Sequence, residues 1–196
     1  MSEKTKTTNI LLSGVGGQGV LLASYVLSQA AMAEGYDVKQ SEVHGMSQRG
    51  GSVMSHLRFG ASLASPLVTQ GAADLLLSFE PLEALRYVHW LSPGGILIYN
   101  TLRVNPSTVA SGLAAYPDDV FAEIAAAWPT VRSVDATALA EKAGTAKAAN
   151  MVLLGAISGE LPFADATWKK IIAEVVPPKT VDANMQAFEL GRAACR

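Results

Sequence analysis

The sequence has 196 residues, 49% of them hydrophobic, so it is long enough to bury a core and lies within the size range of one domain. Fifteen basic and seventeen acidic residues give a net charge of −2, which argues against a nucleic-acid-binding surface and against a polybasic membrane anchor. The only cysteine, Cys195, leaves the chain without an internal disulfide and without the thiolates that hold an iron–sulfur cluster.

No targeting or membrane-spanning segment is predicted. Residues 1–8 are polar and lack the apolar core and small-residue cleavage site of a signal peptide. The uncharged run at 19–33 is interrupted by Ser and Gln and is shorter than the roughly 20 residues that span a bilayer. We therefore expect a cytoplasmic protein with no nucleic-acid or membrane partner, in which this run forms a buried helix.

The first part of the chain predicts strands and helices in alternation. Residues 9–13 predict a short apolar strand, and a glycine cluster then leads into a Val-, Leu- and Ala-rich helix that ends near Gly35. Residues 36–40 and 51–59 predict two more strands, separated by a loop rich in Gly and Ser. The apolar run at 74–79 is typical of a strand buried on both faces of a parallel sheet.

The second part of the chain predicts two more strands and a series of helices. Pro81 suits the first turn of a helix that reaches about residue 91. Strands are predicted at 94–99 and 130–134, and helices at 120–128, 136–143, 146–158, 165–175 and 180–194. The pattern predicts an α/β fold: a Rossmann-like, doubly wound, mostly parallel sheet with helices on both faces and a helical C-terminal region. No linker divides the chain, so we expect a single domain over 1–196.

The glycine cluster at 14–19 reads Gly-Val-Gly-Gly-Gln-Gly and matches G-x-G-x-x-G directly after a predicted strand and before a predicted helix. Backbone N–H groups at a helix N-terminus point outward, the helix dipole adds about half a positive charge, and missing side chains let an anion approach. The loop therefore predicts a phosphate site. The alternative is that these glycines serve only a tight turn and close packing of helix on strand.

The cofactor does not follow from the glycine loop. A nicotinamide-binding domain places an acidic residue about 20 positions further on, at the end of the second strand, where it holds the ribose hydroxyls. Glu42 is the candidate, and it stands just past the predicted end of that strand. An independent NAD- or FAD-dependent oxidoreductase is therefore one alternative function.

Residues 41–52 place polar groups and three glycines in a loop expected at the carboxyl end of the second strand. Open α/β sheets bind their ligands at that end. His44 could donate to a phosphate or orient a partner's group, and Arg49 could clamp a phosphate or carboxylate. The alternative is that His44 is an ordinary hydrogen-bonded loop residue and Arg49 a solvated or interface charge.

Signatures of independent catalysis are missing. The three histidines, His44, His56 and His89, are far apart in the sequence, so no metal site is predicted. The sequence contains no G-x-S-x-G elbow, Cys–His signature or Walker A lysine. We expect a chain that binds a ligand and does not react alone.

Several residues at predicted strand ends have two interpretations. Glu80 is predicted as the acidic start of the helix at Pro81 rather than as a ligand contact. Asn100 and Thr101 could line the ligand cleft, and so could Asp135, which equally suits the N-cap of the following helix. The tryptophans are expected to be core or interface anchors: Trp90, Trp128 and Trp168.

Three stretches of the sequence resemble the gamma-type domain of 2-oxoacid:ferredoxin oxidoreductases. They are residues 14–20, 42–53 and 79–84, and the resemblance continues through 148–155 and 177–179, so that it covers nearly the whole chain. The string from Glu42 to Val53, which contains His-Gly-Met-Ser-Gln-Arg-Gly-Gly, is far more specific than the glycine loop. In detail, these stretches look like the stand-alone subunit of the indolepyruvate-oxidising members of the family.

The resemblance implies a non-cluster subunit of an enzyme that oxidatively decarboxylates arylpyruvates such as indolepyruvate to the aryl-acetyl-CoA and passes electrons to ferredoxin. A larger alpha subunit would carry thiamine diphosphate and the iron–sulfur clusters, and this chain would be inactive alone. Alternatives are a gamma subunit that serves another 2-oxoacid (pyruvate, branched-chain or phenylglyoxylate) and a purely structural subunit.

The resemblance also implies coenzyme A as the ligand, since the gamma-type domain lies beside the thiamine site and is associated with coenzyme A in related enzymes. We expect His44 and Arg49 to face the inter-subunit cleft as the possible catalytic residues. The expected cofactor-binding residues are Gly14, Gly16, Gly17, Gln18, Gly19, Glu42 and Ser47.

Overall fold

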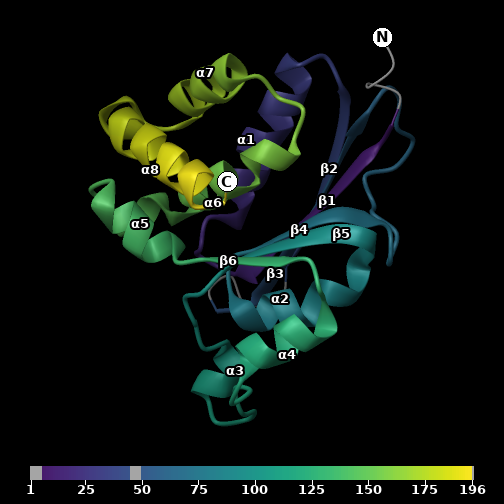
Figure 1. Cartoon of the computed structure of the whole chain (residues 1–196), viewed down its shortest axis with the longest axis vertical. Helices are drawn as coiled ribbons and strands as arrows, with labels where there is room; N and C mark the ends of the chain where they lie inside the picture. The colour runs from purple at the N-terminus through teal and green to yellow at the C-terminus, as the bar shows by residue number, and fades with distance from the viewer. Residues whose placement is uncertain (1–5, 45–49, 196) are drawn as a thin grey trace.

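The computed structural model describes residues 6–195 except 45–49, and for His44 only the backbone. Within this part of the chain, six strands form one sheet in the order β2-β3-β1-β4-β5-β6, with helices on both sides (Figure 1). The strands are β1 (Thr8–Val15), β2 (Asp37–His44), β3 (Ser52–Gly60), β4 (Ala73–Ser78), β5 (Leu91–Asn100) and β6 (Val131–Val134). The predicted α/β class is confirmed.

The sheet is parallel except at β3. The pairs β1–β4, β4–β5 and β5–β6 are parallel, whereas β3 lies antiparallel between β1 and β2. After β1 the chain forms β2 and β3, which lie on one side of β1, and then β4, which lies on its other side. The crevice outside the carboxyl ends of β1 and β4 is therefore the switch point at which open α/β sheets bind ligands.

Two helical layers cover the sheet (Figure 1). One face carries α1 (Val20–Ala33), α5 (Ala136–Lys142), α6 (Ala149–Ile157), α7 (Asp165–Val175) and α8 (Val181–Ala194), and the other carries α2 (Pro81–Tyr87), α3 (Ser107–Ala110) and α4 (Val120–Ala127). Short 3₁₀ turns are η2 (Val88–Trp90), η3 (Ala146–Ala148), η4 (Ser158–Glu160) and η5 (Pro178–Thr180). The predicted helical C-terminal region is confirmed, and each layer has its own apolar core against the sheet.

The prediction for the second strand is wrong at its end. Strand β2 does not stop at residue 40 but continues to His44, because its whole length pairs with β3, from Asp37 opposite Gly60 to His44 opposite Val53. Two consecutive antiparallel strands thus replace the expected alternation of strand and helix. Their pairing extends the sheet by one strand between β1 and β2.

Helix α1 ends as predicted at Gly35, which has a positive φ of 81°. The Gly35 N–H donates to the carbonyl of Met32 (2.9 Å) and the Tyr36 N–H to that of Ala31 (3.1 Å), which is a Schellman ending. The helix is buried on one face only, since Leu21 and Tyr25 are about half exposed. The expectation of a buried helix therefore holds for the face that packs on the sheet and not for the outer face.

Helices α6 and α8 cross with their backbones in contact. A Cβ atom at Gly155 would lie 1.9 Å from the Phe188 carbonyl oxygen, and one at Gly191 would lie 1.9 Å from the Val152 carbonyl oxygen. Trp168 of α7 is fully buried, as predicted for a core anchor, and its ring packs 5.2 Å from that of Phe188. The C-terminal helices therefore form a tightly packed layer.

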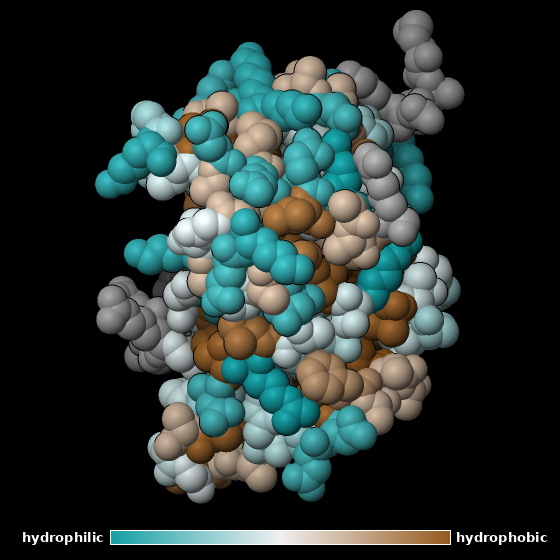
Figure 2. All heavy atoms as spheres, turned by 60° about the vertical axis from the view of Figure 1, so that its left-hand side comes forward, coloured by the Kyte–Doolittle hydropathy of each residue, from teal (hydrophilic) through white to brown (hydrophobic). Residues whose placement is uncertain are grey.

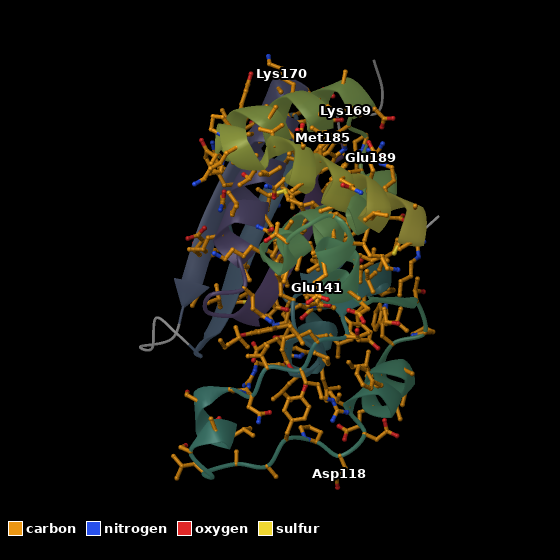
Figure 3. The ribbon with its side chains drawn as sticks, turned by 90° about the vertical axis from the view of Figure 1, so that its left-hand side faces the viewer. Asp118, Glu141, Lys169, Lys170, Met185 and Glu189 are labelled. Atoms are coloured by element: carbon orange, nitrogen blue, oxygen red, sulfur yellow. The ribbon has the colours of Figure 1, made fainter. Side chains whose placement is uncertain are left out.

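The outer surface of this layer is mixed in hydropathy (Figure 2). Figure 3 shows Lys169 of α7 close to Glu189 of α8, and the ammonium lies 3.8 Å from the carboxylate. An exposed pair of this kind contributes about 1 kcal/mol or less to stability. In the part of the chain that the structure describes, every helix is too short or too polar to cross a membrane.

Candidate cofactor-binding site

The glycine loop joins β1 to α1 at the switch point of the sheet. Gly17 (φ 103°) and Gly19 (φ 84°) adopt backbone conformations that residues with side chains rarely adopt. Gly14 is required for packing, because a Cβ there would lie 2.7 Å from Val20 Cγ2 and 2.9 Å from Phe79 Cβ. Gly19 is the N-cap of α1 and offers no side chain to its first-turn N–H groups, which therefore face outward.

Gln18 ties the glycine loop to the end of β4. Its Oε1 accepts a hydrogen bond from the Val15 N–H (2.7 Å), and its Nε2 donates to the Phe79 carbonyl (3.0 Å). Both ends of the carboxamide are thus bonded to backbone. Gln18, predicted as a cofactor-binding residue, is placed by the structure as a brace that shapes the loop.

Replacing Gln18 with alanine should lower the free energy of unfolding by about 2 kcal/mol, because two hydrogen bonds to partly buried backbone groups are lost. Urea denaturation of the full chain followed by circular dichroism measures this loss. Gln186→Ala, at an exposed position on α8, is the control and should change stability by no more than about 0.5 kcal/mol. Equal stability of the two variants would contradict the bracing role.

The root of the β2–β3 hairpin lies against the glycine loop. The Gly16 N–H donates to the Gly51 carbonyl (2.8 Å), and Val15 pairs with Ser52. The structure therefore brings the loop together with the carboxyl-terminal end of the 41–52 segment, as expected from the sheet edge. The predicted site residues Ser47 and Arg49 lie outside the described residues, and of His44 only the backbone, in β2, is described.

Glu42 lies within β2, opposite Ser55, and not past the end of the strand as predicted. Its Oε1 accepts a hydrogen bond from Gln40 Nε2 (3.0 Å) on the exposed surface. Strand β3 separates β2 from β1, which adds about 4.8 Å to the distance between Glu42 and the glycine loop relative to a sheet in which the two strands are neighbours. This geometry disfavours the ribose-holding role and with it the NAD-dependent alternative.

A cavity of about 500 Å³ opens beside the glycine loop. Its walls come from the loop, from the ends of β4 and β5, and from the α5–α6 segment. The lining residues are Gly17, Gln18, Gly19, Leu22, Phe79, Asn100, Leu102, Thr137, Ala146, Lys147, Ala149, Asn150 and Leu153.

The predictions for the strand ends hold in part. Asn100 lines the cavity as proposed, with its Oδ1 accepting the Ala136 N–H (3.0 Å). Thr101 and Asp135 are not among the lining residues.

The N-cap interpretation of Asp135 is confirmed, since its Oδ1 accepts the Ala138 N–H (2.9 Å). Glu80 likewise caps α2 by accepting the Glu83 N–H (3.1 Å), so its helix-start interpretation is confirmed.

Lys147 and Asn150 are two polar lining residues that the sequence did not single out. Asn150 is buried, and its Oδ1 accepts the Met151 N–H (3.0 Å), which turns Nδ2 toward the glycine loop. A Cβ at Gly19 would lie 2.9 Å from this nitrogen. Lys147 is an exposed cation on η3. The loop N–H groups, an amide donor and a cation thus surround one cavity, which suits a phosphate-bearing ligand.

The fold and this cavity define an α/β domain with a ligand-sized cavity at the switch point of its sheet. Residues 9–194 match the model of the pyruvate ferredoxin/flavodoxin oxidoreductase family. Indolepyruvate oxidoreductase subunit IorB of Thermococcus kodakarensis is 44% identical, with 97% of each chain covered. The same subunit of Archaeoglobus fulgidus is 41% identical, covering 93% of this chain and 92% of that one. The chain belongs to the pyruvate ferredoxin/flavodoxin oxidoreductase family.

Solved structures agree with this assignment at the level of the fold. The gamma subunit of a keto/oxoacid ferredoxin oxidoreductase from Geobacter sulfurreducens superposes with a TM-score of 0.70 at 23% identity, covering 96% of this chain and 98% of that one. A 2-oxoglutarate:ferredoxin oxidoreductase from Magnetococcus marinus, with coenzyme A bound, gives a TM-score of 0.73 at 20% identity. It covers 97% of this chain and 31% of the Magnetococcus chain.

Proposed function

We propose that this chain is the non-cluster subunit of an indolepyruvate:ferredoxin oxidoreductase. The assembled enzyme would convert an arylpyruvate and coenzyme A to the aryl-acetyl-CoA and carbon dioxide, with the two electrons passed to ferredoxin. The proposal is supported by the IorB relatives, which are similar to this chain over nearly their full length. A larger partner would supply thiamine diphosphate and the clusters, because a chain with one cysteine cannot ligate them.

The role of this chain within the enzyme is to hold coenzyme A. Coenzyme A would supply the thiol that accepts the acyl group. The N–H groups at the start of α1 would bind one of its phosphates, with Asn150 Nδ2 donating to the same anion and Lys147 adding positive charge. The observation that carries this proposal is that one cavity contains both Lys147 and the glycine loop.

The bound ligand would also be held against an apolar wall. Leu22, Leu102 and Leu153 line the same cavity, and Leu22 and Leu102 are partly exposed at 37% and 42%. A site that combines a few polar anchors with an apolar lining orients its ligand by the anchors and gains affinity from the lining. Such a site fits a ligand with phosphates at one end and a long, weakly polar arm.

A pair of substitutions at Gly16 tests the site. Gly16→Asp places a carboxylate in the loop that is expected to bind the phosphate, whereas Gly16→Asn has nearly the same shape and no charge. In the assembled enzyme, Gly16→Asp should raise the KM for coenzyme A about tenfold more than Gly16→Asn, and the KM for the oxoacid should stay unchanged. Steady-state kinetics with methyl viologen as electron acceptor gives both constants.

The purely structural role makes a different prediction for the same pair. If the glycines serve packing alone, both variants should assemble less well, and the surviving complexes should keep the wild-type KM for coenzyme A. That result would contradict the proposed site.

A further inference from the structure

A buried carboxylate lies at the root of the β2–β3 hairpin. Glu83, in the first turn of α2, is 1% exposed and accepts a hydrogen bond from the Ser52 hydroxyl on Oε2. Its Oε1 accepts a hydrogen bond from Arg86 Nε (3.2 Å). Burial raises the pKa of Glu83, and the bonds from Ser52 and Arg86 only partly offset this effect. A carboxylate in such a place costs stability that an apolar residue would not cost.

Glu83 is linked to the cofactor site through the root of the hairpin. Ser52, whose hydroxyl Glu83 holds, is the first residue of β3 and pairs with Val15 at the end of β1. The residue before it, Gly51, accepts the Gly16 N–H on its carbonyl (2.8 Å). The Ser52 hydroxyl, which Glu83 holds, and the Gly51 carbonyl, which holds the glycine loop, therefore belong to neighbouring residues.

We propose that Glu83 is a positioning residue for the cofactor site: its carboxylate fixes Ser52 and, through the Gly51 carbonyl, the orientation of the Gly16 peptide in the glycine loop. The inference rests on the proposed function of that loop as the coenzyme A phosphate site. Loop N–H groups bind an anion well only when they are held in a common orientation. Loss of the Glu83–Ser52 bond should therefore weaken coenzyme A binding and leave the oxoacid chemistry of the partner unaffected.

A second buried carboxylate on the same helix provides a matched control. Glu80 caps α2 and accepts hydrogen bonds from the Tyr116 hydroxyl (2.5 Å) and the Val104 N–H (3.3 Å) on Oε1. Its carboxylate also accepts the Glu83 N–H, and within the described residues it makes no hydrogen bond to Ser52 or to the glycine loop. Glu80→Gln should therefore lower the melting temperature of the complex without changing its KM for coenzyme A.

The test compares Glu83→Ala, Glu83→Gln and Ser52→Ala in the assembled enzyme. Glu83→Ala and Ser52→Ala should each raise the KM for coenzyme A about tenfold, with kcat and the oxoacid KM within about twofold of wild type. Glu83→Gln keeps an oxygen that accepts the Ser52 hydroxyl and should restore the KM to within about threefold. The double variant Glu83→Ala/Ser52→Ala should be no worse than Ser52→Ala alone, because Ser52→Ala already removes the bond to Glu83 together with the contact between the Ser52 and Tyr87 hydroxyls (3.2 Å).

Two results would overturn the positioning role. In the first, Glu83→Ala lowers the melting temperature but leaves the KM for coenzyme A unchanged, as a purely structural residue would. In the second, Glu80→Gln raises that KM as much as Glu83→Ala does, so that the effect reflects only the stability of α2. If Glu83→Ala does not assemble, Ser52→Ala decides alone, since it removes only a hydroxyl.

The Gly16 pair separates this inference from the proposed function. If Gly16→Asp raises the KM for coenzyme A and neither Glu83→Ala nor Ser52→Ala does, the positioning role is wrong and the coenzyme A site stands. If none of the three raises it, both proposals are wrong.

Discussion

Replacing Gly191 with alanine should lower the free energy of unfolding by about 3 kcal/mol, at the upper end of the range for overpacked positions. The added Cβ would lie 1.9 Å from the Val152 carbonyl oxygen and 2.6 Å from its carbonyl carbon. This steric clash is relieved only if helices α6 and α8 move apart, because the clashing atoms belong to the backbone of Val152 and not to a flexible side chain. Denaturant titration of the full chain gives the loss of stability directly.

Gly159→Ala is the matched control for this prediction. Gly159 lies in η4, directly after α6, and a Cβ there would meet nothing within 4 Å. Alanine at this position should leave stability unchanged or raise it by up to about 1 kcal/mol, because it reduces the freedom of the unfolded chain. The close crossing of α6 and α8 would be contradicted if Gly191→Ala were as stable as Gly159→Ala.

Reversing the charge of Lys147 should raise the KM of the assembled enzyme for coenzyme A at least about tenfold. Lys147→Glu removes the cation of the cavity and places a carboxylate near the expected phosphate, and each charge effect is worth about 1 kcal/mol at an exposed site. The residue is exposed, so the fold should tolerate the change. The KM should also become less sensitive to salt, since one screened attraction has been lost.

Lys142→Glu supplies the comparison for Lys147→Glu. Lys142 is likewise an exposed lysine, in the last turn of α5, and is not among the lining residues of the cavity. Both variants change the net charge by the same amount, so any effect of overall charge should appear in both. Equal KM values for coenzyme A in the two variants would exclude Lys147 from the site.

The sequence predicts the glycine loop because its signals are local. Gly17 and Gly19 stand where the backbone turns with positive φ, and Gly35 ends α1 in the expected way. The capping roles of Glu80 and Asp135 were predictable for the same reason, since an N-cap bonds to an N–H three residues further on. Contacts within a few residues leave a readable pattern in the sequence.

The rest of the site depends on contacts between distant segments. Lys147 and Asn150 reach the cavity only because α6 packs over the end of the sheet, and neither carries a local motif. The sequence predicts Glu42 past the end of β2 because the residues there are polar and give no apolar strand pattern. The pairing of β2 with β3 nevertheless stabilises the strand as far as His44. The contact of Gly155 and Gly191 with the facing helix likewise appears only once α6 and α8 are placed together.

The most direct test of the proposed function is to co-express this chain with the proposed thiamine- and cluster-bearing partner and to measure anaerobic, coenzyme A-dependent reduction of ferredoxin. Indolepyruvate, phenylpyruvate and pyruvate would be compared, with each chain also assayed alone. We expect activity only when both chains are present, with an arylpyruvate as the preferred substrate. Turnover by this chain alone, or tight binding of NADH or FAD to it, would contradict the proposed function and support an independent dehydrogenase.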